Sequence, residues 1–129
     1  MPTPVLHRIL IVDDAVEVAL CFTRVLERYG FEVNYVTDGM EALALHRAAR
    51  AEERPFTLLI LDWAMPILSG LELACAIRAS GDTVKIVFLT AYYDDADLSK
   101  ATEVDAEVWG KPIDVQALSD NVRRVLNVT

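Results

Sequence analysis

The sequence predicts an α/β fold with a doubly wound parallel sheet. Short apolar runs alternate with amphipathic segments five times along the chain, and no long gap interrupts the alternation. The central run, 57–61, contains four consecutive aliphatic residues, as expected of a strand that helices bury on both faces. Parallel strands need long crossover connections, usually helices, and right-handed crossovers place these helices on both faces of the sheet.

The first predicted unit is a strand at 8–12 followed by a helix. The apolar run of the strand ends at Asp13-Asp14, where we expect a polar edge of the sheet. Asp14 and Glu17 have the spacing of a capping box, and Gly30 is the expected stop of the helix. Apolar residues at spacings of three and four predict the buried stripe of this helix, which consists of Ala15, Val18, Phe22, Val25 and Tyr29.

Four further units follow the same pattern. Strands are expected at 31–36, 57–61, 84–89 and around 108–109, and helices at about 38–52, 69–81, 94–101 and after 114. Asp38 and Asp114 are the expected caps of the second and the last helix. The helix at 94–101 has the weakest amphipathic signal. The expected inward residues of the third and last helices are Leu73, Ala74, Ile77, Val115, Leu118, Val122 and Val125.

Length and composition bound the class of protein. We expect 129 residues to form one domain, 1–129, with its core at about 8–126 and no output domain after the last helix. A net charge of -8 argues against nucleic acid or an anionic membrane as a direct partner. No segment approaches the ~20 apolar residues that a membrane-spanning helix requires. Residues 1–8 contain no apolar region of a signal peptide, so the expected location is cytoplasmic.

The two cysteines, Cys21 and Cys75, both fall in predicted helices and outside any short Cys-x-x-Cys spacing. We therefore expect two buried small hydrophobic side chains, and neither a disulfide nor a metal site. This expectation agrees with a reduced setting.

Polar residues follow four of the predicted strands, and they suggest a common site. Asp13-Asp14, Asp62, Thr90 and Lys111 come after the first, third, fourth and fifth strands. The carboxyl ends of parallel strands meet at one edge of the sheet, where ligand crevices form. Clustered carboxylates repel one another by roughly 1 to 4 kcal/mol per pair at ~4 Å, so a bound cation is expected. Carboxylate oxygens without His or Cys favour Mg²⁺, with Mn²⁺ as a second possibility.

The same residue types are suited to phosphoryl transfer. A cation, the Thr90 hydroxyl and the Lys111 ammonium supply what a transferring phosphoryl group needs. Asp62 is the candidate nucleophile, because an aspartyl carboxylate can form an acyl phosphate. Each residue alone also has a structural interpretation, as a helix or turn cap, a strand-end hydroxyl or a solvated surface charge. Their joint placement favours the chemical interpretation.

Five motifs in order make the sequence resemble a response-regulator receiver domain of two-component signalling from about Ile9 to Val125. They are Ile11-Val12-Asp13-Asp14, Asp38-Gly39 with Glu41-Ala42-Leu43, Leu61-Asp62 followed by Met65-Pro66 and Gly70, Leu89-Thr90-Ala91, and Lys111-Pro112. The resemblance implies a flavodoxin-like (βα)5 fold with a five-stranded parallel sheet in the order 2-1-3-4-5.

The resemblance also implies roles for individual residues. Asp62 would be the phosphoacceptor, and Asp14 would bind Mg²⁺ directly. Asp13 would act on the metal directly or through water, and the backbone carbonyl of Ala64 would complete the metal site. Two further residues would contact phosphoryl oxygens, Thr90 and Lys111, and the Lys111-Pro112 bond would be cis.

Several positions depart from the pattern of the family. The aromatic switch residue usual three positions before the lysine is Val108 here, and the aromatic Trp109 follows one residue later. The stretch Val104-Asp105-Ala106 lacks the usual Gly-Ala pair. Ala64 offers no side chain to orient a hydrolytic water, and Tyr92 is bulky enough to shield the site. These last two residues predict slow loss of the phosphoryl group.

The expected partners follow from the resemblance. A sensor histidine kinase or a histidine phosphotransfer protein would donate the phosphoryl group, and an unknown output protein would receive the signal. The face of the fourth helix, fifth strand and fifth helix, expected to include Trp109, is a candidate for homodimerisation. The protein would not be an enzyme beyond its own phosphorylation and slow dephosphorylation.

Two alternatives stay open at this point. A phosphorylation-independent interaction module, or pseudo-receiver, would keep the fold and signal by binding alone. A flavodoxin-like redox protein is disfavoured, because Asp13-Asp14 stand where a phosphate-binding loop rich in hydroxyls and glycine is expected.

Overall fold

A computed structural model describes residues 7–128. The segment 1–6, predicted to contain no signal peptide, and residue 129 lie outside the described residues. The chain alternates strictly between strands and helices, in the order β1 (Arg8–Val12), α1 (Val16–Arg28), β2 (Glu32–Val36), α2 (Gly39–Ala51), β3 (Leu58–Asp62), α3 (Gly70–Ala79), β4 (Lys85–Thr90), α4 (Asp95–Glu103), β5 (Ala106–Gly110) and α5 (Val115–Leu126).

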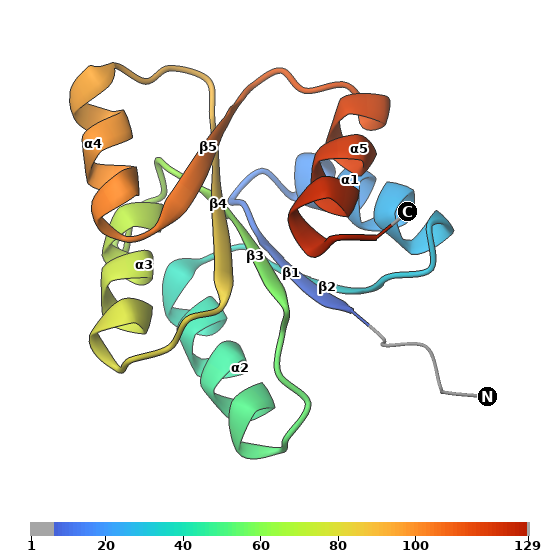
Figure 1. Cartoon of the computed structure of the whole chain (residues 1–129), viewed down its shortest axis with the longest axis horizontal. Helices are drawn as coiled ribbons and strands as arrows, with labels where there is room; N and C mark the ends of the chain where they lie inside the picture. Colours follow the sequence, from blue (N-terminus) through green and yellow to red (C-terminus); the bar gives the residue numbers. More distant parts are fainter. Residues whose placement is uncertain (1–6, 129) are drawn as a thin grey trace.

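The five strands form one parallel sheet in the order β2-β1-β3-β4-β5, so the predicted fold class is confirmed. Helices α1 and α5 cover one face, and α2, α3 and α4 cover the other (Figure 1). The central strand β3 is buried along its whole length, which explains its unbroken aliphatic sequence. Within residues 7–128, no helix has the length and apolar composition needed to span a bilayer.

Helix caps follow the prediction at α2 and α5. Asp38 accepts a hydrogen bond from the backbone of Glu41, and Asp114 accepts one from Ala117. Ser69 and Glu72 form a complete capping box at α3. The inward residues predicted for α3, which are Leu73, Ala74 and Ile77, are all buried.

Helix α1 differs from its prediction at its start and in its buried stripe. The helix starts at Val16 with Ala15 as N-cap and no side-chain capping bond, so the predicted capping box of Asp14 and Glu17 is wrong. Asp13 Oδ1 instead accepts a hydrogen bond from the Ala15 backbone at 2.9 Å. Of the predicted stripe only Phe22 is buried, and Tyr29 is exposed. The buried residues of α1 are Ala19, Phe22, Thr23 and Leu26.

Three other burial predictions are also corrected. Cys21 and Cys75 are exposed free thiols, because both lie on the outer faces of their helices. Val115 is 50% exposed at the first turn of α5, whereas Leu118 and Val122, farther along the helix, are fully buried.

Candidate functional site

Three carboxylates gather at the carboxyl edge of the sheet. Asp62 is the last residue of β3, and Asp13 and Asp14 directly follow the neighbouring strand β1. One oxygen from each of the three lies within 4.8 Å of the others. Asp13 and Asp62 are buried, and Asp14 is exposed to solvent. The structure thus brings together the three acidic residues singled out in the sequence.

Lys111 brings a positive charge to the same site. Its Nζ donates a hydrogen bond to Asp13 Oδ2 at 3.0 Å and lies 3.5 Å from Asp62 Oδ1. The backbone N–H of Lys111 donates to the carbonyl of Thr90 at 2.7 Å, which extends the pairing of β4 and β5 by one residue. The Lys111-Pro112 bond is cis, as the resemblance implied.

The surroundings change the acidity of two of these groups. Burial, followed by the charge of Asp13, raises the pKa of Asp62 from 3.8 to about 6, and Lys111 opposes part of this effect. Burial alone would lower the pKa of Lys111, but its hydrogen bond to Asp13 and the charges of Asp13 and Asp62 outweigh burial and raise that pKa. Lys111 therefore stays charged and offsets part of the repulsion among the carboxylates.

Thr90 and Ala64 lie beside the cluster. Thr90 ends β4, the strand next to β3, and is buried. Its hydroxyl donates to the carbonyl of Tyr92 at 3.1 Å and accepts from the Tyr92 N–H at 3.4 Å. The loop after β4 therefore engages this hydroxyl. Ala64 is exposed in the loop after β3, two residues beyond Asp62.

The backbone of Asp62 lies so close to Gly70, at the start of α3, that no side chain fits at that position. A β-carbon on Gly70 would collide with the main-chain oxygen of Asp62, and the Gly70 N–H donates to the carbonyl of Trp63 at 3.0 Å. The Trp63 ring meets Phe88 edge-on, with ring centroids 4.7 Å apart. In the sequence, Gly70 was noted only as part of a motif and as a helix start, and no sequence pattern predicted this close approach.

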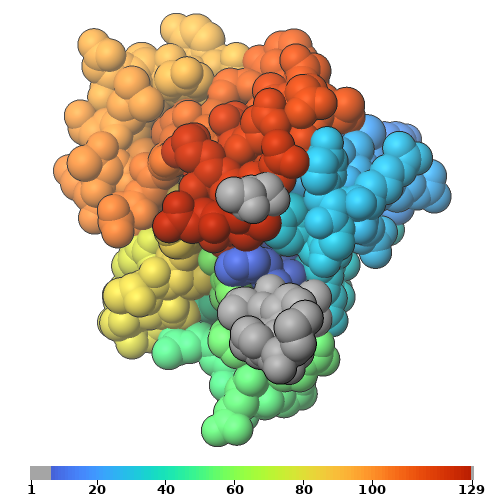
Figure 2. All heavy atoms as spheres, turned by 45° about the vertical axis from the view of Figure 1, so that its right-hand side comes forward, coloured from blue at the N-terminus to red at the C-terminus, as the bar shows by residue number. Residues whose placement is uncertain are grey.

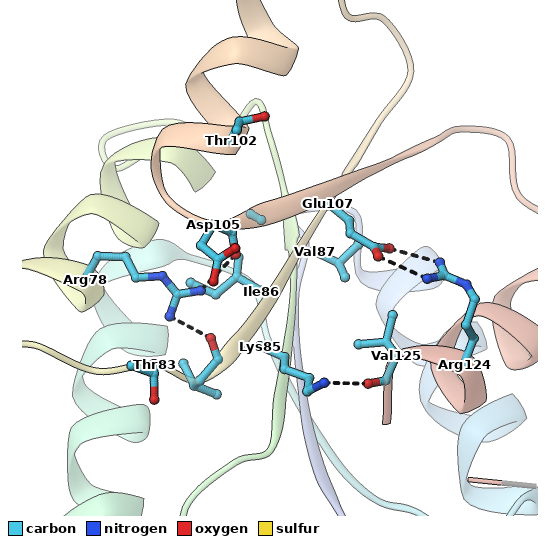
Figure 3. A pocket seen from close by; sticks show the side chains of 12 residues that line it. Arg78, Thr83, Lys85, Ile86, Val87, Thr102, Asp105, Glu107, Arg124 and Val125 are labelled. Atoms are coloured by element: carbon cyan, nitrogen blue, oxygen red, sulfur yellow. Dashed lines mark hydrogen bonds and ion pairs between the residues drawn. The ribbon is translucent and has the colours of Figure 1, made fainter. Parts of the chain in front are cut away.

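Two cavities differ in their relation to the cluster. A mainly apolar one of about 550 Å³ borders Lys111 and is lined by α1 and by the segment after β5. A more polar one of about 440 Å³ lies at the opposite edge of the sheet, among residues from the starts of β4 and β5 and the end of α5 (Figure 3). Only the first adjoins the candidate site.

The donor set fits a hard divalent cation. The cluster offers three carboxylate oxygens, and none of its members is His or Cys. Mg²⁺ commonly binds through one or two carboxylates and keeps several waters, so a partial protein cage at an open edge suits it.

Comparisons with known proteins agree with this geometry. Residues 9–123 match the sequence profile of the response regulator receiver domain. The chain belongs to the response-regulator receiver family. It is therefore a receiver domain of two-component signalling, and receivers bind Mg²⁺ at an acidic pocket such as the one described.

Individual receivers show how far the likeness extends. The receiver protein CpdR of Brucella abortus is 29% identical over 94% of this chain and 98% of its own. Response regulator RppA of a Synechocystis species is 37% identical over 65% of this chain, and the match spans about a third (35%) of RppA. The crystallised chemotaxis protein CheY4 of Vibrio cholerae superposes with a TM-score of 0.84 at 29% identity, covering 94% of this chain and 99% of that protein.

One predicted feature of the receiver is corrected. Trp109 is 6% exposed and packs into the core layer under α1 and α5, where its Nε1 donates to Glu107 at 3.0 Å. Alternation along β5 places Val108 on the other face, against the layer of Ala101 and Val104. Trp109 is therefore not part of an exposed face, and the two residues point to opposite sides of the sheet.

Proposed function

We propose that this receiver accepts a phosphoryl group from a phosphohistidine of a partner protein onto Asp62 and thereby changes an interaction surface. The donor would be a sensor histidine kinase or a histidine phosphotransfer protein. The observation that carries the proposal is the convergence of Asp13, Asp14 and Asp62 with the Lys111 ammonium, 3.0 Å from Asp13 and 3.5 Å from Asp62.

The transfer assigns a task to each residue. An oxygen of the Asp62 carboxylate attacks phosphorus, the phosphorus–nitrogen bond breaks, and the donor imidazole leaves with that electron pair and takes up one proton. Lys111 turns from the carboxylates toward a phosphoryl oxygen, and the Thr90 hydroxyl donates to another.

The metal site would be formed by Asp13, Asp14, Asp62 and the backbone carbonyl of Ala64. Bound Mg²⁺, or Mn²⁺, would supply positive charge that offsets the charge on the transferring phosphoryl group. Asp13 also accepts a hydrogen bond from the Ala15 backbone N–H at 2.9 Å, which helps to hold its carboxylate in the cluster.

The decisive experiment exposes the protein to a small-molecule phosphodonor with and without Mg²⁺. We expect one base-labile phosphoryl adduct by intact mass, dependent on Mg²⁺ and lost in Asp62→Asn. Asp105→Asn, which alters an exposed carboxylate at the other edge of the sheet, is the matched control. An unmodified wild type under conditions that label a known receiver would favour the alternative, a phosphorylation-independent pseudo-receiver.

We further propose that the phosphoryl group on Asp62 is lost slowly. Ala64 has no polar side chain that would orient an attacking water. The Tyr92 side chain is 83% exposed, so it would shield the site only after turning inward. After donor removal we expect decay over minutes or longer, and faster decay in Ala64→Asn; loss within seconds in the wild type would contradict the proposal.

The surface that changes is proposed to be the one formed by α4, β5 and α5. Figure 2 shows these elements together on one face, from orange to red. If this face forms a homodimer, the sedimentation coefficient should increase after phosphorylation. An unchanged coefficient would indicate that the signal passes to a different output protein. The exposed thiols of Cys21 and Cys75 suit the reduced, cytoplasmic setting that we propose.

A further inference from the structure

The strand β5 contains no aromatic side chain in a position to relay a change at Asp62. Val108, at the position usual for a switch aromatic, is small and half-buried against the α4 layer. Trp109 lies on the opposite face, buried and hydrogen-bonded to Glu107. A relay toward α4 therefore has to use another residue.

Tyr93 occupies the surface that Gly110 leaves open. Gly110 is the last residue of β5 and pairs with Thr90 across the two strands. A β-carbon on Gly110 would lie 3.8 Å from Cε1 of Tyr93 and 4.0 Å from its hydroxyl oxygen, which is ordinary van der Waals contact. The Tyr93 side chain is 40% exposed, so its ring is partly covered by this packing and partly in water.

Thr90 connects this ring to the phosphoryl site. A hydroxyl has one proton to donate, and in this structure the Thr90 hydroxyl donates it to the carbonyl of Tyr92, the residue before Tyr93. Donation to a phosphoryl oxygen on Asp62 removes that bond from the Tyr92 carbonyl. The loop that positions Tyr93 then keeps only the longer bond from the Tyr92 N–H to the Thr90 hydroxyl, at 3.4 Å, and is held less firmly at the end of β4.

We propose that Tyr93 is the mobile aromatic residue of this receiver, and that its ring leaves Gly110 when Asp62 is phosphorylated. The inference rests on the proposed function of Asp62. It assigns the relay to the loop after β4, in place of an aromatic residue on β5.

The start of α4 follows Tyr93 directly. Asp94 is the N-cap of α4 and forms a complete capping box with Asp97, so the first turn moves with the loop. The other end of α4 is fixed, because Arg78 donates to the carbonyls of Val104 at 2.7 Å and Asp105 at 3.1 Å. A displacement of Tyr93 therefore tilts α4 about its carboxyl end.

The test follows Tyr93 by ¹⁹F NMR in the full chain labelled with 3-fluorotyrosine, which gives four signals for four tyrosines. Tyr93→Phe assigns the signal of interest. With Mg²⁺ and acetyl phosphate, the Tyr93 signal should shift in proportion to the phosphorylated fraction measured by mass on the same sample, and the signals of Tyr29 and Tyr35 should not. A phosphoryl adduct with an unchanged Tyr93 signal would overturn the relay alone. Absence of the adduct would overturn the proposed function and the relay with it.

Substitutions of Gly110 test the packing independently of phosphorylation. Gly110→Leu fills the place of the ring and should move the Tyr93 signal of the unphosphorylated protein toward its phosphorylated position. Gly110→Ala, whose β-carbon makes only ordinary contact, is the matched control and should leave the signal in place. An unshifted Tyr93 signal in a folded Gly110→Leu protein would contradict the packing.

Removal of Tyr93 tests the output. Tyr93→Ala should form the phosphoryl adduct to the same extent as wild type and lose the phosphorylation-dependent change in hydrogen exchange over Asp95–Glu103. Tyr92→Ala is the matched control, because its side chain is 83% exposed and only its backbone bonds to Thr90. An unchanged exchange response in Tyr93→Ala would overturn the assignment.

Discussion

The carboxylate of Asp62 is costly to ionise in the folded protein, because burial and the charge of Asp13 both oppose its negative charge. Its pKa rises from 3.8 to about 6, so between these pH values the folded state binds more protons than the unfolded state. By linkage, the free energy of unfolding falls as pH rises through this window and stays lower above it.

The pH dependence gives a prediction for Asp62→Asn. In EDTA at pH 7.5, the free energy of unfolding of this variant should exceed that of the wild type by about 1–2 kcal/mol, a figure that allows for screening by water at the open edge. At pH 4 the two free energies should differ little. Urea unfolding followed by tryptophan fluorescence measures the difference. Asp105→Asn is the control, and an Asp62→Asn advantage equal at both pH values would contradict the origin given for it.

Gly70 gives a second prediction for a single residue. In Gly70→Ala the new β-carbon meets the main-chain oxygen of Asp62, so the loop or α3 has to shift. Overpacking of this kind costs about 1–3 kcal/mol. We expect a lower urea midpoint and weaker Mg²⁺ binding by fluorescence titration, whereas Gly110→Ala should change neither. Wild-type stability in Gly70→Ala would contradict this prediction, because it would mean that the loop can move away from the new β-carbon at little cost.

The position of the candidate site could be predicted from the sequence because it depends mainly on the parallel arrangement of the strands. Once the strands are parallel, the residues after β1, β3 and β5 have to meet at one edge, which brings Asp13, Asp62 and Lys111 together. Thr90 ends β4, the strand next to β3, as the strand order requires. The hydrogen bond of its hydroxyl to Tyr92 depends on a loop conformation that residue types do not determine.

At the scale of the element, α1 shows why buried faces were harder to predict than helices. Thr23 is buried because its hydroxyl donates to the carbonyl of Ala19 at 2.8 Å, so a polar residue type can lie in an apolar stripe. Tyr29 was placed in that stripe, but it is the C-cap, and the guanidinium of Arg123 lies 5.2 Å from its ring centroid. The buried stripe of α1 is turned by about one position from the predicted one, so different residues face the sheet.

Helix α4 has the weakest amphipathic pattern, and its stability depends on a contact from α3. The Arg78 guanidinium donates to the carbonyls of Asp82 and Val84, in the connection between α3 and β4, and to those of Val104 and Asp105 at the end of α4. Figure 3 shows Arg78 beside Asp105. Among side chains, only the planar guanidinium group of arginine has enough N–H donors to bond all of these carbonyls at once.

Arg78→Lys therefore tests the attachment of α4. The lysine keeps the charge but reaches fewer carbonyls, and we expect a loss of about 2–3 kcal/mol in the free energy of unfolding. Hydrogen exchange should rise first over Asp95–Glu103. Lys85→Gln, which alters a single exposed hydrogen bond to the Val125 carbonyl, is the control. Equal losses in the two variants would mean that the fork of Arg78 has no special role.

At the scale of the whole molecule, the acidic cluster couples metal binding to folding. The chain has a net charge of -8, and three of its carboxylates lie within 4.8 Å of one another only when β1 and β3 are paired. A cation that needs all three binds the folded state in preference to the unfolded chain. Above its Kd, each tenfold rise in Mg²⁺ should then add about 1.4 kcal/mol to the free energy of unfolding.

Thermal unfolding at a series of Mg²⁺ concentrations measures this coupling. The melting temperature of the wild type should rise with the logarithm of Mg²⁺ concentration, and Asp13→Asn and Asp62→Asn should lose most of the rise. K⁺ at matched ionic strength separates site binding from general screening of the net charge. An equal rise in Asp62→Asn, or in K⁺, would mean that the cation acts on the whole charged surface and that the three carboxylates do not form a metal site.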